Sequence, residues 1–97
     1  MKMVQLERSN GNISLFLIIY DIVDNKKRSK VAKILEGFGA RVQYSAFECR
    51  LTTQQFKRMK KQLYDCTSNE DNLRIYELSN NYQPDKETAV FYDLYLI

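Results

Sequence analysis

The sequence predicts a single α+β domain in which two helices cover one face of an antiparallel sheet. Its 97 residues allow one hydrophobic core but are too few to cover both faces of a sheet with helices. An apolar fraction of 44% and a single proline are typical of a folded chain. Short apolar or aromatic runs alternate with two segments of helical periodicity, which is the pattern of an α+β domain.

The N-terminal residues 1–12 are polar and contain Gly11, so we expect a flexible leader ahead of one domain at residues 13–97. The leader has no basic, apolar and cleavage-site pattern, and no signal peptide is expected. Residues 14–23 are almost continuously apolar, which predicts a strand covered on both faces. Because two helices cover only one face, we expect a second copy of the chain on the other, in a homodimer.

The first helix is predicted over residues 25–38. Asp24 is suited to cap its N-terminus. Its apolar side chains fall on one stripe, formed by Val31, Ile34, Leu35 and Phe38. Gly37 and Gly39 end the helix, and we expect Gly39 in the left-handed C-terminal position.

Residues 41–51 are strand-like and predict either one bent strand or two short strands joined at residues 44–45. Thr52 and Gln55 form a capping box for a second helix over residues 53–66. The apolar stripe of this helix consists of Phe56, Met59, Leu63 and Cys66. A structural role for Cys66 follows from its place in the stripe.

Two more strands are predicted, at residues 73–78 and at about residues 88–96, with a loop around Pro84 between them. The resulting order βαββαβ, with an extra C-terminal strand, is typical of a ferredoxin-like sandwich. The last strand is rich in aromatic residues, and together with the acidic C-terminal third it is a candidate partner surface. Its aromatic residues are Phe91, Tyr92 and Tyr95.

The chain has no histidine, which removes the usual general base and the commonest transition-metal ligand. Cys49 and Cys66 form no CxxC pair, so reduced thiols are expected rather than a disulfide or a metal site. Any catalysis would therefore depend on carboxylates, which favour a hard cation such as Mg²⁺. Asp21 is the first candidate, since a charge near the end of a buried strand is costly without a partner or a function.

The net charge of +3 is unevenly distributed. Residues 1–64 hold 13 Lys and Arg against 5 Asp and Glu, whereas residues 65–97 hold 2 against 7. This pattern suits a nucleic-acid-binding protein with a protein partner, or equally a domain with uneven surface charge. The candidate nucleic-acid-binding residues of the first helix are Lys26, Lys27, Arg28, Lys30 and Lys33, and those of the second are Lys57, Arg58 and Lys61.

Three segments together resemble CRISPR-associated protein 2, the small subunit of the prokaryotic spacer-acquisition machinery. They are Tyr20-Asp21-Ile22 at a strand end, the basic helix start Lys26-Lys27-Arg28, and the stretch from Gly39 to Cys49. The resemblance extends over about residues 14–80. It implies a cytoplasmic, ferredoxin-like homodimer whose two sheets face each other, in agreement with the burial argument.

The resemblance also implies site residues. It assigns catalytic roles to Tyr20, Asp21, Arg28, Arg41 and Phe47, and a shared Mg²⁺ ion to the Asp21 pair of a dimer. Two positions depart from the usual pattern. Lys27 stands where a second arginine is common, which loses bidentate phosphate binding, and Ala46 replaces a common valine.

Two functions remain open at this point. One is a magnesium-dependent endonuclease that cuts single-stranded RNA or duplex DNA at the paired Asp21 carboxylates. The other is a non-catalytic scaffold that bridges copies of the integrase subunit, CRISPR-associated protein 1, and holds duplex DNA. Asp24 is expected to cap its helix rather than bind metal. A regulatory dimer with a small ligand is disfavoured, since no glycine-rich or convergent polar pocket is apparent in the sequence.

Overall fold

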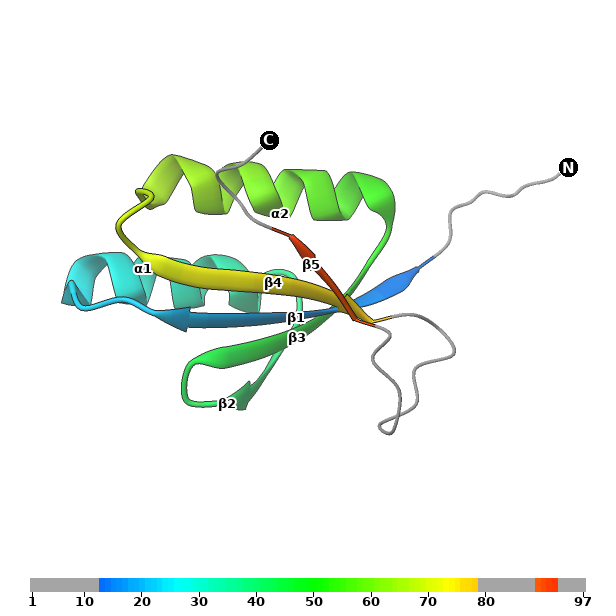
Figure 1. Ribbon diagram of the computed structural model, residues 1–97, viewed down its shortest axis with the longest axis horizontal. Helices are drawn as coiled ribbons and strands as arrows, with labels where there is room; N and C mark the ends of the chain where they lie inside the picture. Colours follow the sequence, from blue (N-terminus) through cyan, green and yellow to red (C-terminus); the bar gives the residue numbers. More distant parts are fainter. Residues whose placement is uncertain (1–12, 79–88, 93–97) are drawn as a thin grey trace, which may run out of the picture.

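The computed structural model describes residues 13–78 and 89–92, and of 89–92 the backbone only. These residues form β1 (Ser14–Asp21), α1 (Asn25–Glu36), β2 (Ala40–Gln43), β3 (Ala46–Leu51), α2 (Thr53–Cys66), β4 (Asn72–Leu78) and β5 (Ala89–Tyr92). The sheet has the order β2-β3-β1-β4-β5, and all neighbouring strands are antiparallel (Figure 1). The predicted ferredoxin-like order with an extra C-terminal strand is confirmed. The leader at residues 1–12, the Pro84 loop and Tyr95 lie outside the described residues.

Strand β1 lies at the centre of the sheet, and its side chains alternate between the two faces. Phe16, Ile18 and Tyr20 are buried on the side of the helices. On the opposite side Leu15 and Leu17 are half-buried, and Ile19 is 40% exposed. The described residues thus leave a row of apolar side chains on the face of the sheet that carries no helix.

Both helices cover the same face, because their buried side chains join a single core with β1, β3 and β4 (Figure 1). The helical contribution to this core comes from Val31, Leu35, Phe56, Met59 and Leu63. The ring of Phe56 stacks on that of Phe16 with centroids 4.2 Å apart, which joins α2 to β1. Cys66 packs at the edge of the core, as its place in the stripe predicts.

The helix caps agree with the sequence prediction. Asp24 Oδ2 accepts a hydrogen bond of 2.8 Å from the Lys27 N–H. At α2 the N–H of Thr52 donates to Gln55 Oε1 over 2.9 Å, and the N–H of Gln55 donates to Thr52 Oγ1 over 3.2 Å. The predicted capping box is therefore present.

Two predicted elements, the first strand and the first helix, were too long at their C-terminal ends. Strand β1 ends at Asp21 rather than at Val23, whose side chain is exposed, because the chain turns there and the Val23 carbonyl accepts from the Arg28 side chain. Helix α1 ends at Glu36 rather than at residue 38, because the Gly37 N–H bonds to Ile34 in a tighter turn. Of the two alternatives for residues 41–51, the structure has two strands joined at residues 44–45.

The expected left-handed conformation of Gly39 was wrong, since its φ lies outside that region. The reason for glycine here is close approach. A Cβ at Gly39 would overlap the carbonyl oxygen of Glu48 and would lie 2.8 Å from Cys49 Cα. Glycine therefore allows the chain to enter β2 directly against β3.

Cys49 and Cys66 are both free, as predicted. Burial raises the pKa of the Cys49 thiol to about 11, which keeps it protonated at neutral pH. Among the described residues, neither helix has the length and apolar character that crossing a membrane requires.

Candidate functional site

The end of β1, the start of α1 and the β2–β3 turn meet at one end of the sheet. The Tyr20 N–H donates a hydrogen bond of 3.0 Å to the carbonyl of Ser45, which holds the turn beside the end of β1. The predicted site residues lie on or next to these three segments. This hydrogen bond joins the β2–β3 turn to β1, and the loop after β1 leads directly into α1, so the three segments are held at one end of the sheet.

Arg28 fixes the loop that follows β1. Its Nη1 donates to the carbonyls of Ile22 at 2.9 Å and Val23 at 3.2 Å, and its Nη2 donates to Asn25 Oδ1. The guanidinium therefore satisfies carbonyls that have left the sheet ladder. In this position Arg28 supports the backbone next to Asp21.

Arg41 is held in a similar way from β2. Its Nη1 donates to the Tyr44 carbonyl over 2.7 Å, and its guanidinium carbon lies 5.1 Å from the centre of the Phe47 ring. Phe47 also stacks against Tyr20, with centroids 6.3 Å apart. Because Phe47 is 0% exposed, it cannot contact a ligand directly and positions Arg41 and Tyr20 instead.

These side chains surround a cavity of about 130 Å³ on the side of the sheet that carries the helices. Its lining residues are Tyr20, Arg28, Ser29, Ala32, Arg41 and Tyr44. Tyr20, Arg28 and Arg41 were predicted site residues, and the structure brings them together. Ser29 and Ala32 were missed, although their spacing of three on one helix is the signal that they share a face.

Asp21 lies apart from this cavity. It is the last residue of β1, pairs with Asn72 of β4, and follows Tyr20, so its side chain belongs to the helix-free face. The carboxylate is exposed, and it has no hydrogen bond or ion pair with any other described residue. The predicted catalytic set is therefore divided between the two faces of the sheet.

The metal prediction for Asp21 is limited by the number of carboxylates near it. Within the described part of the chain, no group of three or more His, Cys, Asp or Glu side chains is placed to hold a metal ion. Asp24 lies three residues further on, but its Oδ2 is used as the helix cap. Of these two carboxylates, Asp21 is therefore the one without a hydrogen-bond partner among the described residues.

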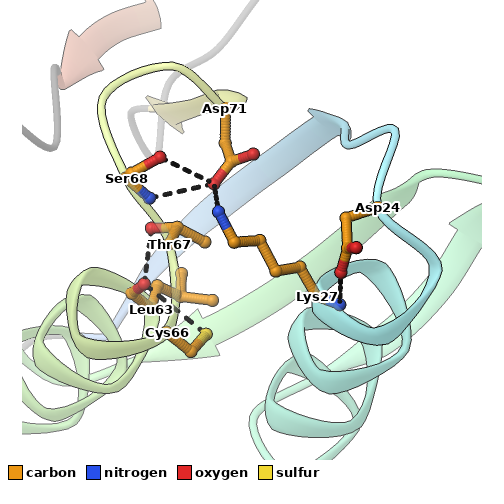
Figure 2. Close-up of polar contacts among 7 residues, drawn as sticks. All are labelled: Asp24, Lys27, Leu63, Cys66, Thr67, Ser68 and Asp71. Carbon is orange, nitrogen blue, oxygen red and sulfur yellow. Dashed lines mark hydrogen bonds and ion pairs between the residues drawn. The ribbon is translucent and has the colours of Figure 1, made fainter.

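Lys27 has a partner that the sequence did not indicate. Its Nζ lies 3.1 Å from Oδ2 of Asp71, 44 positions away in the α2–β4 loop (Figure 2). The same oxygen accepts a hydrogen bond of 2.9 Å from the Ser68 N–H. This N–H and then Lys27 lower the pKa of Asp71, and the hydrogen bond to Asp71 raises the pKa of Lys27. The predicted nucleic-acid-binding lysine joins α1 to the α2–β4 loop.

Asp71→Asn is expected to lower the melting temperature by a few degrees at pH 7, since the ion pair is lost while an amide oxygen still accepts from Ser68. The native pKa of Asp71 lies below its ordinary 3.8. The stabilisation of the fold by the ionised Asp71 is therefore complete above pH 3.8 and is lost as the pH falls through the native pKa. It also weakens as the pH rises past 10.5, the ordinary pKa of Lys27. Melting curves of both proteins at pH 3, 7 and 11 measure this. A difference of equal size at all three would show that the charges contribute nothing.

The family model of CRISPR associated protein Cas2 matches residues 14–85. The chain belongs to the Cas2 family. The match includes both the cavity and Asp21.

Individual Cas2 proteins support the assignment. The chain is 48% identical over 68 residues to CRISPR-associated endoribonuclease Cas2 3 of Synechocystis, covering 69% of this chain and 74% of the relative. Cas2 of Streptococcus pyogenes, solved at pH 6.5, superposes with a TM-score of 0.65 at 34% identity, covering 76% and 96% of the two chains. A chain of a partial Cas6-RT-Cas1–Cas2 complex superposes with a TM-score of 0.56 at 32% identity, covering 69% and 80%.

The other predicted nucleic-acid-binding residues of this Cas2-family chain are on the surface. On α1, Lys26, Lys30 and Lys33 are exposed, as are Lys57, Arg58 and Lys61 on α2. Of these, Lys61 pairs with Asp65 at 3.1 Å, one turn along the helix. Nucleic-acid binding by the two exposed basic faces stays a prediction.

Proposed function

We propose that two copies of the chain pair through the helix-free face of the sheet and act as a metal-dependent endonuclease at their Asp21 carboxylates. The observation that carries this proposal is the position of Asp21. Asp21 continues the apolar row of Leu15, Leu17 and Ile19 on that face. Its carboxylate is exposed and has no hydrogen bond or ion pair with another described residue. A second copy, related by a two-fold axis near the end of β1, would cover this row of side chains and bring the two Asp21 carboxylates close together.

The donors fit a hard cation only as a pair. Mg²⁺ is commonly held by one or two carboxylates and keeps several of its waters, which matches two Asp21 side chains better than one. When bound, the ion would polarise a phosphoryl oxygen of the substrate. The contribution of the chain is to hold the carboxylates still, because Arg28 binds the two carbonyls that follow Asp21 in the loop.

The names of the relatives and the surface charge support a nucleic-acid substrate. The Synechocystis relative is named an endoribonuclease, so single-stranded RNA is the first candidate, with duplex DNA as the second. Exposed lysines on α1 attract either polyanion without regard to its sequence.

A second function is favoured by a separate observation. Exposed basic side chains line both helices, and a two-fold axis would repeat each patch with the symmetry of duplex DNA. The likeness to a chain of a Cas1–Cas2 complex supports a partner of the Cas1 type. As a scaffold, the dimer would hold duplex DNA and bridge integrase subunits without cutting.

The experiment that separates these functions uses purified protein with labelled single-stranded RNA and duplex DNA, with Mg²⁺ or with a chelator. We expect cleavage only with Mg²⁺, binding in both conditions, and the mass of two chains by light scattering. Binding of duplex without any cleavage would leave the scaffold as the function. A single-chain mass would contradict both.

A further inference from the structure

The cavity beside Tyr44 has a chemical character of its own. The described residues that line it include two arginines, two tyrosines and one serine, and none of them is acidic. It lies on the side of the sheet that carries the helices, whereas Asp21 lies on the opposite face. A site of this composition favours an anionic ligand. The carboxylate of Asp21 on the opposite face would repel such a ligand.

Both guanidiniums donate hydrogen bonds to neutral acceptors, and Arg41 also forms one exposed ion pair, with Glu36. Within the described part of the chain, Arg28 donates to two carbonyls and one amide oxygen, and two of its five N–H groups have no partner there. Arg41 donates to the Tyr44 carbonyl, and its Nη2 lies 3.8 Å from Oε2 of Glu36. Because both side chains of this ion pair are exposed, it balances the charge of Arg41 only weakly. Such preorganised arginines bind phosphate groups well, because their remaining N–H groups face the ligand already oriented.

Tyr44 adds an exposed aromatic ring at the rim of the cavity. The residue is 76% exposed, although its backbone is fixed by the bond from Arg41. An exposed ring adds little to the stability of the free protein, because it buries little surface. It does offer a stacking surface for a base. Bases are available for stacking only where they are unpaired, so a ring next to a phosphate-binding cavity favours a single strand over a duplex.

We propose that the cavity holds one phosphate of a single-stranded nucleic acid while the ring of Tyr44 stacks on the adjacent base. The cavity is small, so it suits a phosphate group and leaves the base outside on Tyr44. The inference rests on the proposed function in one respect, that the ligand is nucleic acid. It adds a binding site on the other side of the sheet from Asp21 and a preference for unpaired strands.

The test is the binding of fluorescently labelled tetrathymidylate, measured by anisotropy in chelator so that cleavage does not enter. Tyr44→Ala should weaken binding about tenfold, which is the usual effect of removing one base-stacking ring. The same variant should bind an abasic tetramer and a short duplex as the wild type does. Arg41→Gln should weaken binding of both tetramers and reduce the slope of log affinity against log salt by about 1.

The matched control is Arg50→Gln, which removes the same charge from an exposed position of β3 at the far end of the sheet. It should bind the tetramer as the wild type does. Equal losses for Arg50 and Arg41 variants, or wild-type binding by Tyr44→Ala, would overturn the inference. Should Arg41→Gln fail to fold, the Tyr44 variant with the abasic oligomer still decides the question. If the wild type cleaves normally with Mg²⁺ but Tyr44→Ala binds the tetramer as the wild type does, this binding site is rejected and the nuclease stands. If the wild type does not cleave but the variants bind the tetramer as expected, the nuclease is rejected and this site stands.

Discussion

Asp21→Asn is expected to reduce magnesium-dependent cleavage at least about 100-fold while leaving the fold and the two-chain mass unchanged. The metal ion contributes several kcal/mol of charge stabilisation in the transition state, and each 1.36 kcal/mol lost is a factor of ten in rate. An amide is a much weaker ligand for Mg²⁺ than a carboxylate. Because Asp21 is exposed and has no described partner, its replacement removes no internal contact seen in the structure. Initial rates on labelled RNA and DNA, with light scattering on the same samples, measure the effect.

Asp24→Asn is the matched control for this substitution. It removes the same charge three residues away, and asparagine still caps α1 through its side-chain oxygen. We expect this variant to cut at close to the wild-type rate. If both variants lost activity equally, the cause would be the local charge rather than metal binding. If Asp21→Asn cut as fast as the wild type, the activity would not belong to this site.

Gly39→Ala is expected to destabilise the protein by about 3 kcal/mol, at the upper end of the usual cost of overpacking. The added methyl would overlap the Glu48 carbonyl and lie 2.6 Å from Cys49 Sγ and 2.8 Å from Cys49 Cα. Backbone atoms cannot rotate away as the end of a flexible side chain can, so β2 would have to separate from β3. Urea unfolding of the purified variant measures the loss, and the displaced Arg41 should also weaken tetrathymidylate binding.

Gly37→Ala provides the comparison, since it lies two residues earlier in the same turn. Its φ of −76° is accessible to alanine, and a Cβ there would be 3.3 Å from the Ile34 carbonyl. We expect a change of at most about 1 kcal/mol in either direction. If the two alanine variants had equal stability, close approach would not be the reason for glycine at position 39.

The secondary structure could be predicted because its signals are local. The apolar stripe of α2 and the capping box at Thr52 lie within single turns of a helix, and both appear in the structure as expected. Boundaries were less accurate, since they depend on long-range contacts. No local signal marks the end of β1 at Asp21, where Arg28 binds the carbonyls that follow. The same holds for the close approach of Gly39 to Glu48.

The candidate site was predicted in part. The resemblance named Tyr20, Arg28 and Arg41, and these do line one cavity. It also named Asp21 with them, but alternation along β1 places consecutive residues on opposite faces. That separation was open to sequence reasoning, whereas the pairing of Lys27 with Asp71 was not, because 44 positions separate them.

The sequence by itself determined the order of the elements, the core faces of both helices, the absence of histidine chemistry and the resemblance to Cas2. These follow from residue type and short-range spacing. Only the tertiary structure decided which charges remain available. It joined Lys27 to Asp71, held Arg28 and Arg41 with carbonyl oxygens, and left Asp21 and Tyr44 exposed. The physical reason is that desolvation, ion pairing and hydrogen bonding depend on neighbours in space, which folding brings from distant parts of the chain.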